Sequence, residues 1–375
     1  MAYIAATATA VPEYYYEQDV LAATLKKYCS YIGLDIELSV IDTLFKNTNI
    51  DGRYFSATLD SFFDPPGLKV RSQMCSEAAT NLCEKTVRQV LDRAGLEPSD
   101  ISQLVSMMST VVMIPTVDAM LMNRIPFSPH TKRAPMNGLG CMGGVSGLSR
   151  VADYLEGHPA EAVLLISCEL GGTAFWQGGV QGYLNEVANA ETRGPTFYSD
   201  LISQIVSVAL FGDGAGAVLM VGDQHRLARS GLPRVLGSRS GFLQNTHYVA
   251  GVDVLDNGFH NRLSIEVPQL AKVGLRPVLG GLLDERGLSV ADIGHWIIHP
   301  GGPKVLQATA EEFGLKSDDL KLSEGVLARI GNVSAPTVLY MLDETFANYS
   351  LPEGTYGIIM GMGPGFSQEA VLLQW

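Results

Sequence analysis

The sequence predicts an α/β protein built from two related halves. Short apolar runs that are typical of strands alternate along the chain with amphipathic runs of helical spacing, which is the pattern of layered α/β folds. The phrase LDRAGLEPSDI at 91–101 is echoed by LDERGLSVADI at 283–293, which indicates an internal duplication. Polar residues interrupt an apolar run near 222–229, so the expected domains are residues 1–224 and 225–375.

The elements of the first half follow from its apolar spacing. Residues 76–93 place apolar side chains on one helical face, and Gly95 ends that helix before the strand-like run 104–108. The apolar run 162–166 predicts a further buried strand. The stretch 176–194 contains four glycines and no periodicity, so we expect a surface loop or an insertion there.

Two amphipathic helices are expected at equivalent positions of the two halves. One covers 145–155 and the other covers 338–346, and a glycine precedes each. When the halves are aligned on the repeated phrase, Cys141 falls within one residue of Asn332. The N-termini of the two helices should therefore face a common pseudo-twofold axis.

Cys141 stands in the phrase GLGCMGG at 138–144, where a strand turns into a helix. Glycines permit a tight turn and a close backbone approach, and a helix N-terminus favours a thiolate. Cys141 is therefore the candidate nucleophile. The other cysteines lack this setting and are interpreted as buried apolar residues. They are Cys29, Cys75, Cys83 and Cys168.

His299 follows the apolar strand WII at 296–298 and precedes a Pro-Gly-Gly turn. A histidine at a strand end points into the crevice where α/β sheets bind ligands. Asn332 opens the second amphipathic helix, where an amide can also be an ordinary N-cap. Together with Cys141 these residues supply a partner for a thiolate and two donors for a developing oxyanion. Five further histidines lie in polar or loop settings and are expected at the surface: His130, His158, His225, His247 and His295.

The composition excludes several classes of function. The chain has 375 residues, of which 46% are hydrophobic and 17% charged, and this fits a compact globular protein of about two domains. A formal net charge of −13 without a basic stripe is unfavourable for a nucleic-acid partner. We recognise no membrane span, secretory signal or metal-ligand spacing, so we expect a cytoplasmic protein without a metal site.

Five phrases, taken in order, resemble the type III polyketide synthases of the chalcone synthase superfamily. They are GCMGG at 140–144, LFGDGAG at 210–216, HPGGPK at 299–304, GNVS at 331–334 and GMGPGF at 361–366. The resemblance extends over essentially the whole chain. It implies the thiolase fold, in which two duplicated βαβαβ halves form a five-layered αβαβα sandwich.

The resemblance also implies a reaction. Cys141 would take an acyl group from a CoA thioester, while His299 and Asn332 would hold the thioester oxygen and the enolate that forms when malonyl-CoA loses CO₂. This reaction is a decarboxylative Claisen condensation, and the enzyme that catalyses it is an acyltransferase that forms a carbon–carbon bond. Malonyl-CoA and acyl-CoA are substrates, and no cofactor is implied. The family is homodimeric. Ile114 occupies the position from which a side chain in this family reaches across the twofold axis into the partner's cavity.

The cavity residues that the resemblance assigns differ in part from those of the plant enzymes. Phe211 would separate the CoA tunnel from the reaction cavity, and Gly301 and Lys304 would lie along the pantetheine path. Asn261 stands in place of a second gatekeeping phenylalanine, and Met362 replaces a phenylalanine of the terminal phrase. Four positions that line the family's elongation cavity carry small residues here, namely Ser109, Gly171, Ala174 and Ser334.

Small wall residues leave apolar volume, which binds an alkyl chain at about 0.8 kcal/mol per buried CH₂. We therefore expect a fatty-acyl starter and a pyrone or resorcinol-type product, as in the bacterial alkylpyrone and alkylresorcinol synthases. Two other interpretations fit the same three polar residues. One is a 3-ketoacyl-carrier-protein synthase of the initiating type, and the other is a non-catalytic paralogue that binds acyl-CoA.

Overall fold

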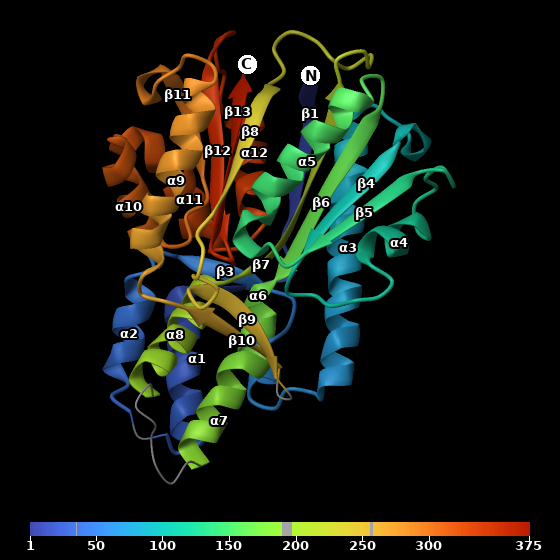
Figure 1. Cartoon of the computed structure of the whole chain (residues 1–375). Helices are drawn as coiled ribbons and strands as arrows, with labels where there is room; N and C mark the ends of the chain where they lie inside the picture. The colour runs from blue at the N-terminus through green and yellow to red at the C-terminus, as the bar shows by residue number, and fades with distance from the viewer. Residues whose placement is uncertain (35, 190–196, 256–257) are drawn as a thin grey trace.

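Figure 1 shows the chain as a computed structural model, which describes residues 1–34, 36–189, 197–255 and 258–375. Within these residues nine strands form one large mixed sheet in the order β5, β4, β6, β7, β1, β8, β13, β12, β11. Their bounds are β1 Ala2–Ala10, β4 Gln103–Met108, β5 Lys132–Asn137, β6 Ala162–Leu170, β7 Asp213–Gly222, β8 Arg234–Phe242, β11 Ile293–Ile298, β12 Tyr356–Gly363 and β13 Ser367–Gln374.

The two halves of this sheet repeat one pairing pattern. In the first half β4 runs parallel to β6, and the pairs β6–β7 and β7–β1 are antiparallel. In the second half β11 runs parallel to β12, and the pairs β12–β13 and β13–β8 are antiparallel. The halves join where β1 pairs with β8 at Ala2 and Tyr3. The predicted duplication is confirmed, because each copy of the repeated phrase ends a long helix and leads into β4 or β11.

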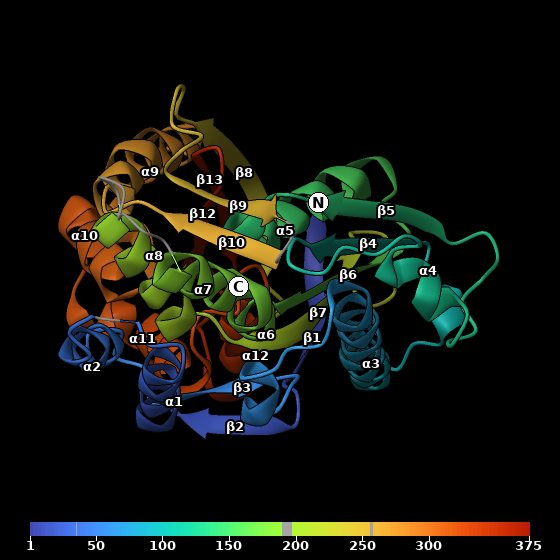
Figure 2. The same cartoon turned by 90° about the horizontal axis from the view of Figure 1, so that it is seen from below.

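The two halves of the sheet form two layers of the fold, and helices form three more. α5 and α12 lie between the two halves of the sheet, α3 and α4 cover the outer face of the first half, and α9 and α10 cover that of the second (Figure 2). Their bounds are α3 Leu68–Ala94, α4 Val117–Met122, α5 Gly143–Gly157, α9 Val267–Asp284, α10 Pro303–Phe313 and α12 Thr337–Asn348. The arrangement is the predicted five-layered αβαβα sandwich.

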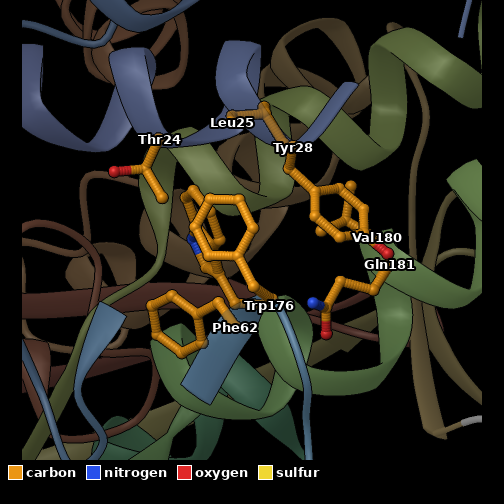
Figure 3. A pocket seen from close by; sticks show the side chains of 8 residues that line it. Thr24, Leu25, Tyr28, Phe62, Trp176, Val180 and Gln181 are labelled. Atoms are coloured by element: carbon orange, nitrogen blue, oxygen red, sulfur yellow. The ribbon is translucent and has the colours of Figure 1, made fainter. Parts of the chain in front are cut away.

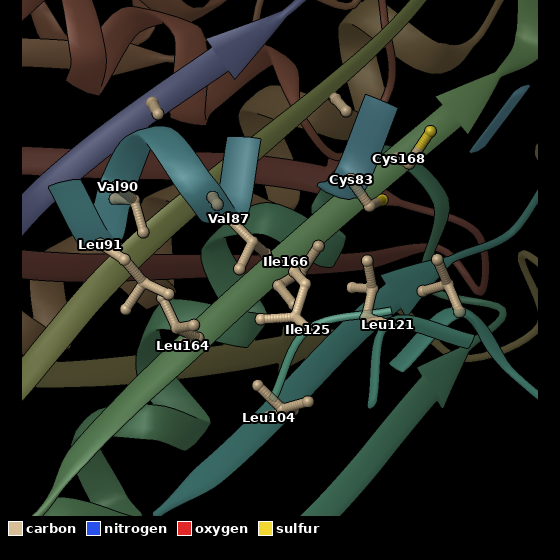
Figure 4. Packing of buried hydrophobic residues seen from close by; sticks show 14 of the residues in the cluster. Cys83, Val87, Val90, Leu91, Leu104, Leu121, Ile125, Leu164, Ile166 and Cys168 are labelled. Carbon is tan, nitrogen blue, oxygen red and sulfur yellow. The ribbon is translucent and has the colours of Figure 1, made fainter. Parts of the chain in front are cut away.

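The outer helix α3 shows how apolar spacing produces a layer. Cys83, Val87 and Val90 recur at intervals of three and four residues and pack over β6, where Leu164 and Ile166 point toward them (Figure 4). All five side chains are fully buried. Because burying an aliphatic side chain contributes about 1.5–3 kcal/mol, this stripe is enough to fix the helix on the sheet.

The starts of α5 and α12 touch each other near the pseudo-twofold axis. Gly144 lies so close to Ala335 that a Cβ at position 144 would overlap the carbonyl oxygen of Ala335 and approach Val338 to 2.6 Å. A Cβ at Gly143 would approach Met107 to 2.7 Å. A side chain at position 144 would push the central helices apart, so packing itself requires this glycine, whereas one at position 143 would displace the side chain of Met107.

A smaller unit of helices and two two-stranded sheets lies below the large sheet in Figure 1. It contains α1 Gln18–Tyr31, α2 Ser39–Lys46, α6 Gly171–Ala174, α7 Gln181–Asn189, α8 Phe197–Leu210, β2 Tyr14–Glu17, β3 Gly52–Phe55, β9 Ala250–Leu255 and β10 Gly258–Leu263. The remaining helix, α11 Ser317–Ile330, contacts both β3 and β11 and so connects this unit to the sheet.

The prediction of a surface loop at 176–194 is wrong for the part that the structure describes. Phe175–Val180 forms a π-helical turn that continues into α7. Trp176 is 1% exposed and stacks on Phe62, with 5.0 Å between the ring centroids (Figure 3). The glycines interrupt the apolar spacing of this segment, so its burial in the apolar core of the smaller unit was not evident from the sequence. Residues 190–194 lie outside the described residues.

His295 is buried rather than exposed at the surface as predicted. Its side chain is 7% exposed, and its ring nitrogen Nε2 lies 2.9 Å from the hydroxyl of Thr345 on α12. A polar ring can enter a core when a partner meets its hydrogen-bonding requirement, and a neighbour from another part of the chain cannot be seen in the local sequence.

Candidate active site

Three separate elements bring the predicted polar groups into one cavity. Cys141 lies in a 3₁₀ turn, Gly140–Met142, that leads directly into α5. His299 follows the end of β11, and Asn332 follows the end of α11. All three residues line the same cavity. The structure thus places together the residues that the sequence singled out from opposite halves.

The turn that holds Cys141 depends on Gly140. This residue has a φ of +49°, and a Cβ there would approach the ring of Pro364 to 2.8 Å. The N–H of Gly140 donates to the hydroxyl of Ser109 at 3.1 Å. The turn is therefore fixed between the loop that joins β12 to β13, which contains Pro364, and the end of β4, which Ser109 follows.

Cys141 and Asn332 are in direct contact. The sulfur lies 3.8 Å from Nδ2 and 3.9 Å from Oδ1 of the amide. The backbone N–H of Ser334 donates to Oδ1 at 2.7 Å, which engages the carbonyl end of the amide in a local turn. Nδ2 remains the donor that can serve a group bound at the sulfur.

Burial dominates the acidity of Cys141. It raises the pKa of the thiol to about 11, against the opposing effect of hydrogen bonds from Ser334 and Asn332. Desolvation of a charged sulfur therefore acts against the thiolate that a helix N-terminus favours. When the thiol is neutral, its proton must leave as the sulfur attacks.

His299 is fully buried, and burial lowers the pKa of its imidazole to about 3. The ring is therefore neutral at neutral pH, with one N–H donor and one nitrogen acceptor. Neither ring nitrogen has a hydrogen-bond partner among the described residues. Because an unpaired buried nitrogen costs stability, the arrangement is typical of a side chain that is kept for chemistry.

Phe211 is coupled to Asn332 through the backbone. The N–H of Asn332 donates to the carbonyl of Leu210 at 2.9 Å, and the N–H of Gly212 donates to the carbonyl of Asn332 at 3.0 Å. The ring of Phe211 meets that of Phe175 edge-on, with 5.1 Å between the centroids. Both rings form part of the cavity wall. The two hydrogen bonds form a backbone bridge between Phe211 and Asn332. A displacement of either segment would therefore move both the cavity wall and the amide.

The cavity encloses about 710 Å³ of space outside the protein atoms, including the part that opens to solvent. Away from the three polar groups its wall is mostly apolar. This apolar part includes Val252, Leu263, Val267, Val305, Met362 and Phe366. A concave apolar wall with a few convergent polar groups is the usual form of a small-molecule site.

Several of the predicted substrate-binding residues line this cavity and several do not. Those on the wall are Ser109, Phe211, Asn261, Gly301 and Ser334. Those that are not on the wall are Gly171, Ala174, Lys304 and Ile114. Lys304 is exposed at the start of α10, and Ile114 is 95% exposed. Gly171 and Ala174 were expected on this wall and lie outside it. Lys304 was expected along the pantetheine path and Ile114 in the partner's cavity, and both stay predictions.

Gly171 lies behind the wall because two rings stand in front of it. A Cβ at this position would contact Phe175 at 3.4 Å and Phe211 at 3.5 Å. The neighbouring Ala174 is buried, and the wall position beside it is taken by Phe175. Small residues at 171 and 174 therefore make room for aromatic rings rather than for a substrate.

Asn261 places an amide where the plant enzymes have a ring. Its Nδ2 donates to the hydroxyl of Ser207 on α8 at 2.8 Å, and Gln204 donates to its backbone carbonyl at 2.9 Å. The side chain is 6% exposed and lines the cavity. These bonds attach β10 to α8, so the amide is held in place by its neighbours.

Glu169 is an additional acid behind the cavity wall that was not predicted from the sequence. It accepts hydrogen bonds from the N–H of Thr110 at 2.8 Å and from its hydroxyl at 2.5 Å. Burial raises the pKa of Glu169 to about 7, against hydrogen bonds from Thr110 and Ser109, which both line the cavity. A lone acid within the apolar strand β6 was the signal available in the sequence.

Two further properties concern the described part of the chain. No group of three or more His, Cys, Asp or Glu side chains in it is placed to hold a metal ion. None of its helices combines the length and the apolar character that crossing a membrane requires.

Comparison with known proteins gives matches to both halves of the chain. Residues 2–224 match the family described as chalcone and stilbene synthases, N-terminal domain, and residues 235–375 match the C-terminal domain of the same family. A 1,3,6,8-tetrahydroxynaphthalene synthase of Streptomyces peucetius subsp. caesius is 32% identical over 99% of this chain and 93% of its own length. A 3,5-dihydroxyphenylacetyl-CoA synthase of Amycolatopsis balhimycina is 28% identical over 91% of this chain and 87% of its own length.

Solved structures share the same fold. A fungal type III polyketide synthase, ORAS, has a TM-score of 0.85 at 23% identity, covering 100% of this chain and 99% of that chain. The 1,3,6,8-tetrahydroxynaphthalene synthase of Streptomyces coelicolor A3(2), a bacterial type III polyketide synthase, has a TM-score of 0.84 at 24% identity, with coverage of 100% and 99%. The chain therefore belongs to the family of chalcone and stilbene synthases, which are type III polyketide synthases.

Proposed function

We propose that this enzyme condenses malonyl-CoA onto an acyl-CoA starter carried by Cys141. One observation carries the proposal: Nδ2 of Asn332 lies 3.8 Å from the sulfur of Cys141 in a cavity that His299 also lines. Type III polyketide synthases are acyltransferases that catalyse Claisen condensation and need no cofactor beyond their CoA thioester substrates.

The loading step starts from a neutral thiol and a neutral imidazole. The sulfur of Cys141 attacks the thioester carbonyl of the starter while its proton passes to His299. The carbonyl oxygen becomes an oxyanion that Nδ2 of Asn332 stabilises by a hydrogen bond. When the oxyanion collapses, CoA leaves with the proton from His299, and the acyl group remains as a thioester on Cys141.

The extension step uses the same two donors. Malonyl-CoA loses CO₂, and the electron pair of the broken bond moves into an enolate whose oxygen accepts hydrogen bonds from Asn332 and the neutral His299. The enolate carbon then attacks the thioester on Cys141. The new ketoacyl chain leaves on CoA, and the released thiolate of Cys141 takes up a proton.

The starter in this proposal is a fatty-acyl CoA, and the product is a pyrone or resorcinol that carries its alkyl chain. The apolar wall formed by Val252, Leu263 and Val267 supports this choice, because each buried CH₂ contributes about 0.8 kcal/mol. Asn261 takes less space than the ring of the plant enzymes. The rings of Phe175 and Phe211 form another part of the cavity wall.

A second candidate starter is one without a long chain. The Streptomyces peucetius relative is named for a tetrahydroxynaphthalene, a compound that carries no alkyl group. Incubation of the enzyme with malonyl-CoA and a panel of acyl-CoAs, from acetyl to long-chain and benzoyl, separates the candidates by mass spectrometry of the products. Preference for acetyl-, malonyl- or benzoyl-CoA would exclude the fatty-acyl proposal.

The enzyme is a cytoplasmic homodimer in this proposal. Val112 and Ile114 lie in the loop that follows β4 and are 62% and 95% exposed although both are apolar. Adjacent large apolar side chains on a surface are typical of a contact with another protein. A second copy of the chain would cover them.

A further inference from the structure

A buried cation holds the C-terminal end of α8. This helix ends at Leu210, so its last carbonyl groups lack partners within the helix. Arg53 on β3 supplies them, because its Nη1 donates to the carbonyl of Val208 at 2.7 Å and to that of Phe211 at 2.6 Å. A positive charge at a helix C-terminus is also favoured by the helix dipole.

Arg53 is completely enclosed by protein. Its side chain is 0% exposed, and its Nε donates to Gln18 at 3.2 Å. Gln18 in turn donates to the carbonyl of Ala209 at 2.8 Å, so the two side chains share the end of α8. The rings of Phe45 and Phe55 lie 5.9 and 5.5 Å from the guanidinium carbon. Burial lowers the pKa of Arg53 to about 9, which leaves it charged at neutral pH.

The stem of the same side chain supports the segment that carries Asn332. A Cβ at Gly331 would approach Cδ of Arg53 to 2.6 Å and Cγ to 2.7 Å. A Cβ at Gly212 would lie 3.5 Å from Cβ of Arg53. Arg53 therefore packs against both sides of the backbone bridge that joins Phe211 to Asn332. A buried charge is costly, and its cost is offset here by hydrogen bonds to Gln18, to the end of α8 and to the Phe211 carbonyl of this bridge.

We infer that Arg53 is a positioning residue that sets the Phe211 ring and the Asn332 amide relative to Cys141. It does not line the cavity, so it acts through the backbone that it holds. The effect of Arg53 on catalysis rests on the proposed function. Its effect on geometry concerns only the distance between the amide of Asn332 and the sulfur of Cys141. That effect can be measured without any CoA substrate.

Alkylation of Cys141 by iodoacetamide reports on the amide. The hydrogen bond from Asn332 lowers the pKa of the thiol, so withdrawal of the amide leaves less thiolate at a given pH. Arg53→Met keeps the stem but removes every donor. At about pH 8.5 we expect it to slow alkylation of Cys141 about fivefold in protein shown to be folded by circular dichroism. Arg53→Lys, which keeps the charge, should give an intermediate rate.

The same substitution in an Asn332→Ala background separates positioning from general loosening. If Arg53 acts through Asn332, then Arg53→Met should leave the alkylation rate of Asn332→Ala unchanged. Arg93→Met is the matched control, because it breaks an ion pair with Asp343 and a bond to the Thr7 carbonyl away from the cavity. It should keep the wild-type rate.

Two outcomes overturn the inference: a wild-type alkylation rate in Arg53→Met, or equal slowing in both backgrounds. If Arg53→Met does not fold, Gln18→Leu tests the same anchor and should show a smaller effect with the same dependence on Asn332. With malonyl-CoA, Arg53→Met should lower kcat for decarboxylation more than it raises KM. Failure of the proposed reaction would be visible in the wild type and would leave the alkylation result intact.

Discussion

The amide nitrogen of Asn332 lies 3.8 Å from the sulfur of Cys141, although the two residues belong to opposite halves of a duplicated chain. Each residue stands shortly before one of the two central helices, α5 and α12, and the starts of these helices touch at Gly144 and Ala335. The pseudo-twofold symmetry of the fold therefore creates the contact. A thiol contributed by one half meets a donor contributed by the other.

Removal of either donor should greatly slow the extension step. We expect Asn332→Ala and His299→Ala each to slow malonyl-CoA decarboxylation by about 10²–10³-fold, since both hold the enolate oxygen. Asn332→Ala should still load the starter on Cys141, because His299 can still take the thiol proton. Labelled CO₂ release measures the first effect and intact-protein mass the second. Undiminished decarboxylation in both variants would remove the proposed roles.

Starter length should respond to Gly171 even though this residue lies behind the wall. Gly171→Leu would push the rings of Phe175 and Phe211 into the cavity, since a Cβ alone already contacts both. Long-chain starters should be lost while short ones remain usable. Phe175→Ala should have the opposite effect and extend the usable range. The product profile across an acyl-CoA panel measures both, and an unchanged profile in both variants would refute the wall assignment.

Ile114 should control assembly. Light scattering should give the wild type a mass of twice 40.3 kDa, and Ile114→Glu should weaken the dimer because it buries a charge at the contact. Ile265→Glu is the control, since Ile265 is equally apolar and 92% exposed in another part of the surface. It should leave the mass unchanged. A wild-type monomer of 40.3 kDa at micromolar concentration would contradict the proposal.

His295 should make the fold sensitive to acid. Burial lowers its pKa from 6.5 to about 4, so only the unfolded chain takes up the proton between these values. The free energy of unfolding therefore falls as the pH drops below 6.5, and His295 should account for a loss of about 2 kcal/mol at pH 5. His295→Gln keeps a hydrogen-bonding group without this titration. Urea midpoints at pH 7.5 and 5 should fall less in the variant, and an equal fall would show that His295 is not the cause.

The turn at Cys141 and the strand end at His299 could be predicted because local sequence determines them. Glycines around Cys141 specify a tight turn, and the apolar run before His299 specifies a strand end. The pseudo-twofold relation to Asn332 was visible in the repeated phrase. The turn and the strand end each depend on a few adjacent residues, and the pseudo-twofold relation depends on the repeat. The structure places all three side chains in one cavity.

The wall of the cavity could not be predicted in the same way. Whether Gly171 opens space depends on which rings arrive beside it, and Phe175 and Phe211 come from different elements. Arg53 gives no local signal either, because its burial depends on the end of α8 reaching β3. The acidity of Cys141 likewise depends on its burial in the folded cavity, which the local sequence does not determine.

The most direct test of the central claim is the mass of the intact protein after it is mixed with an acyl-CoA, followed by addition of malonyl-CoA. We predict that the wild type gains one acyl group, that peptide mapping places this group on Cys141, and that malonyl-CoA then gives extended products. Cys141→Ala should give neither the adduct nor the products. Products from Cys141→Ala, or an acyl group mapped to Cys75 or another cysteine, would contradict it.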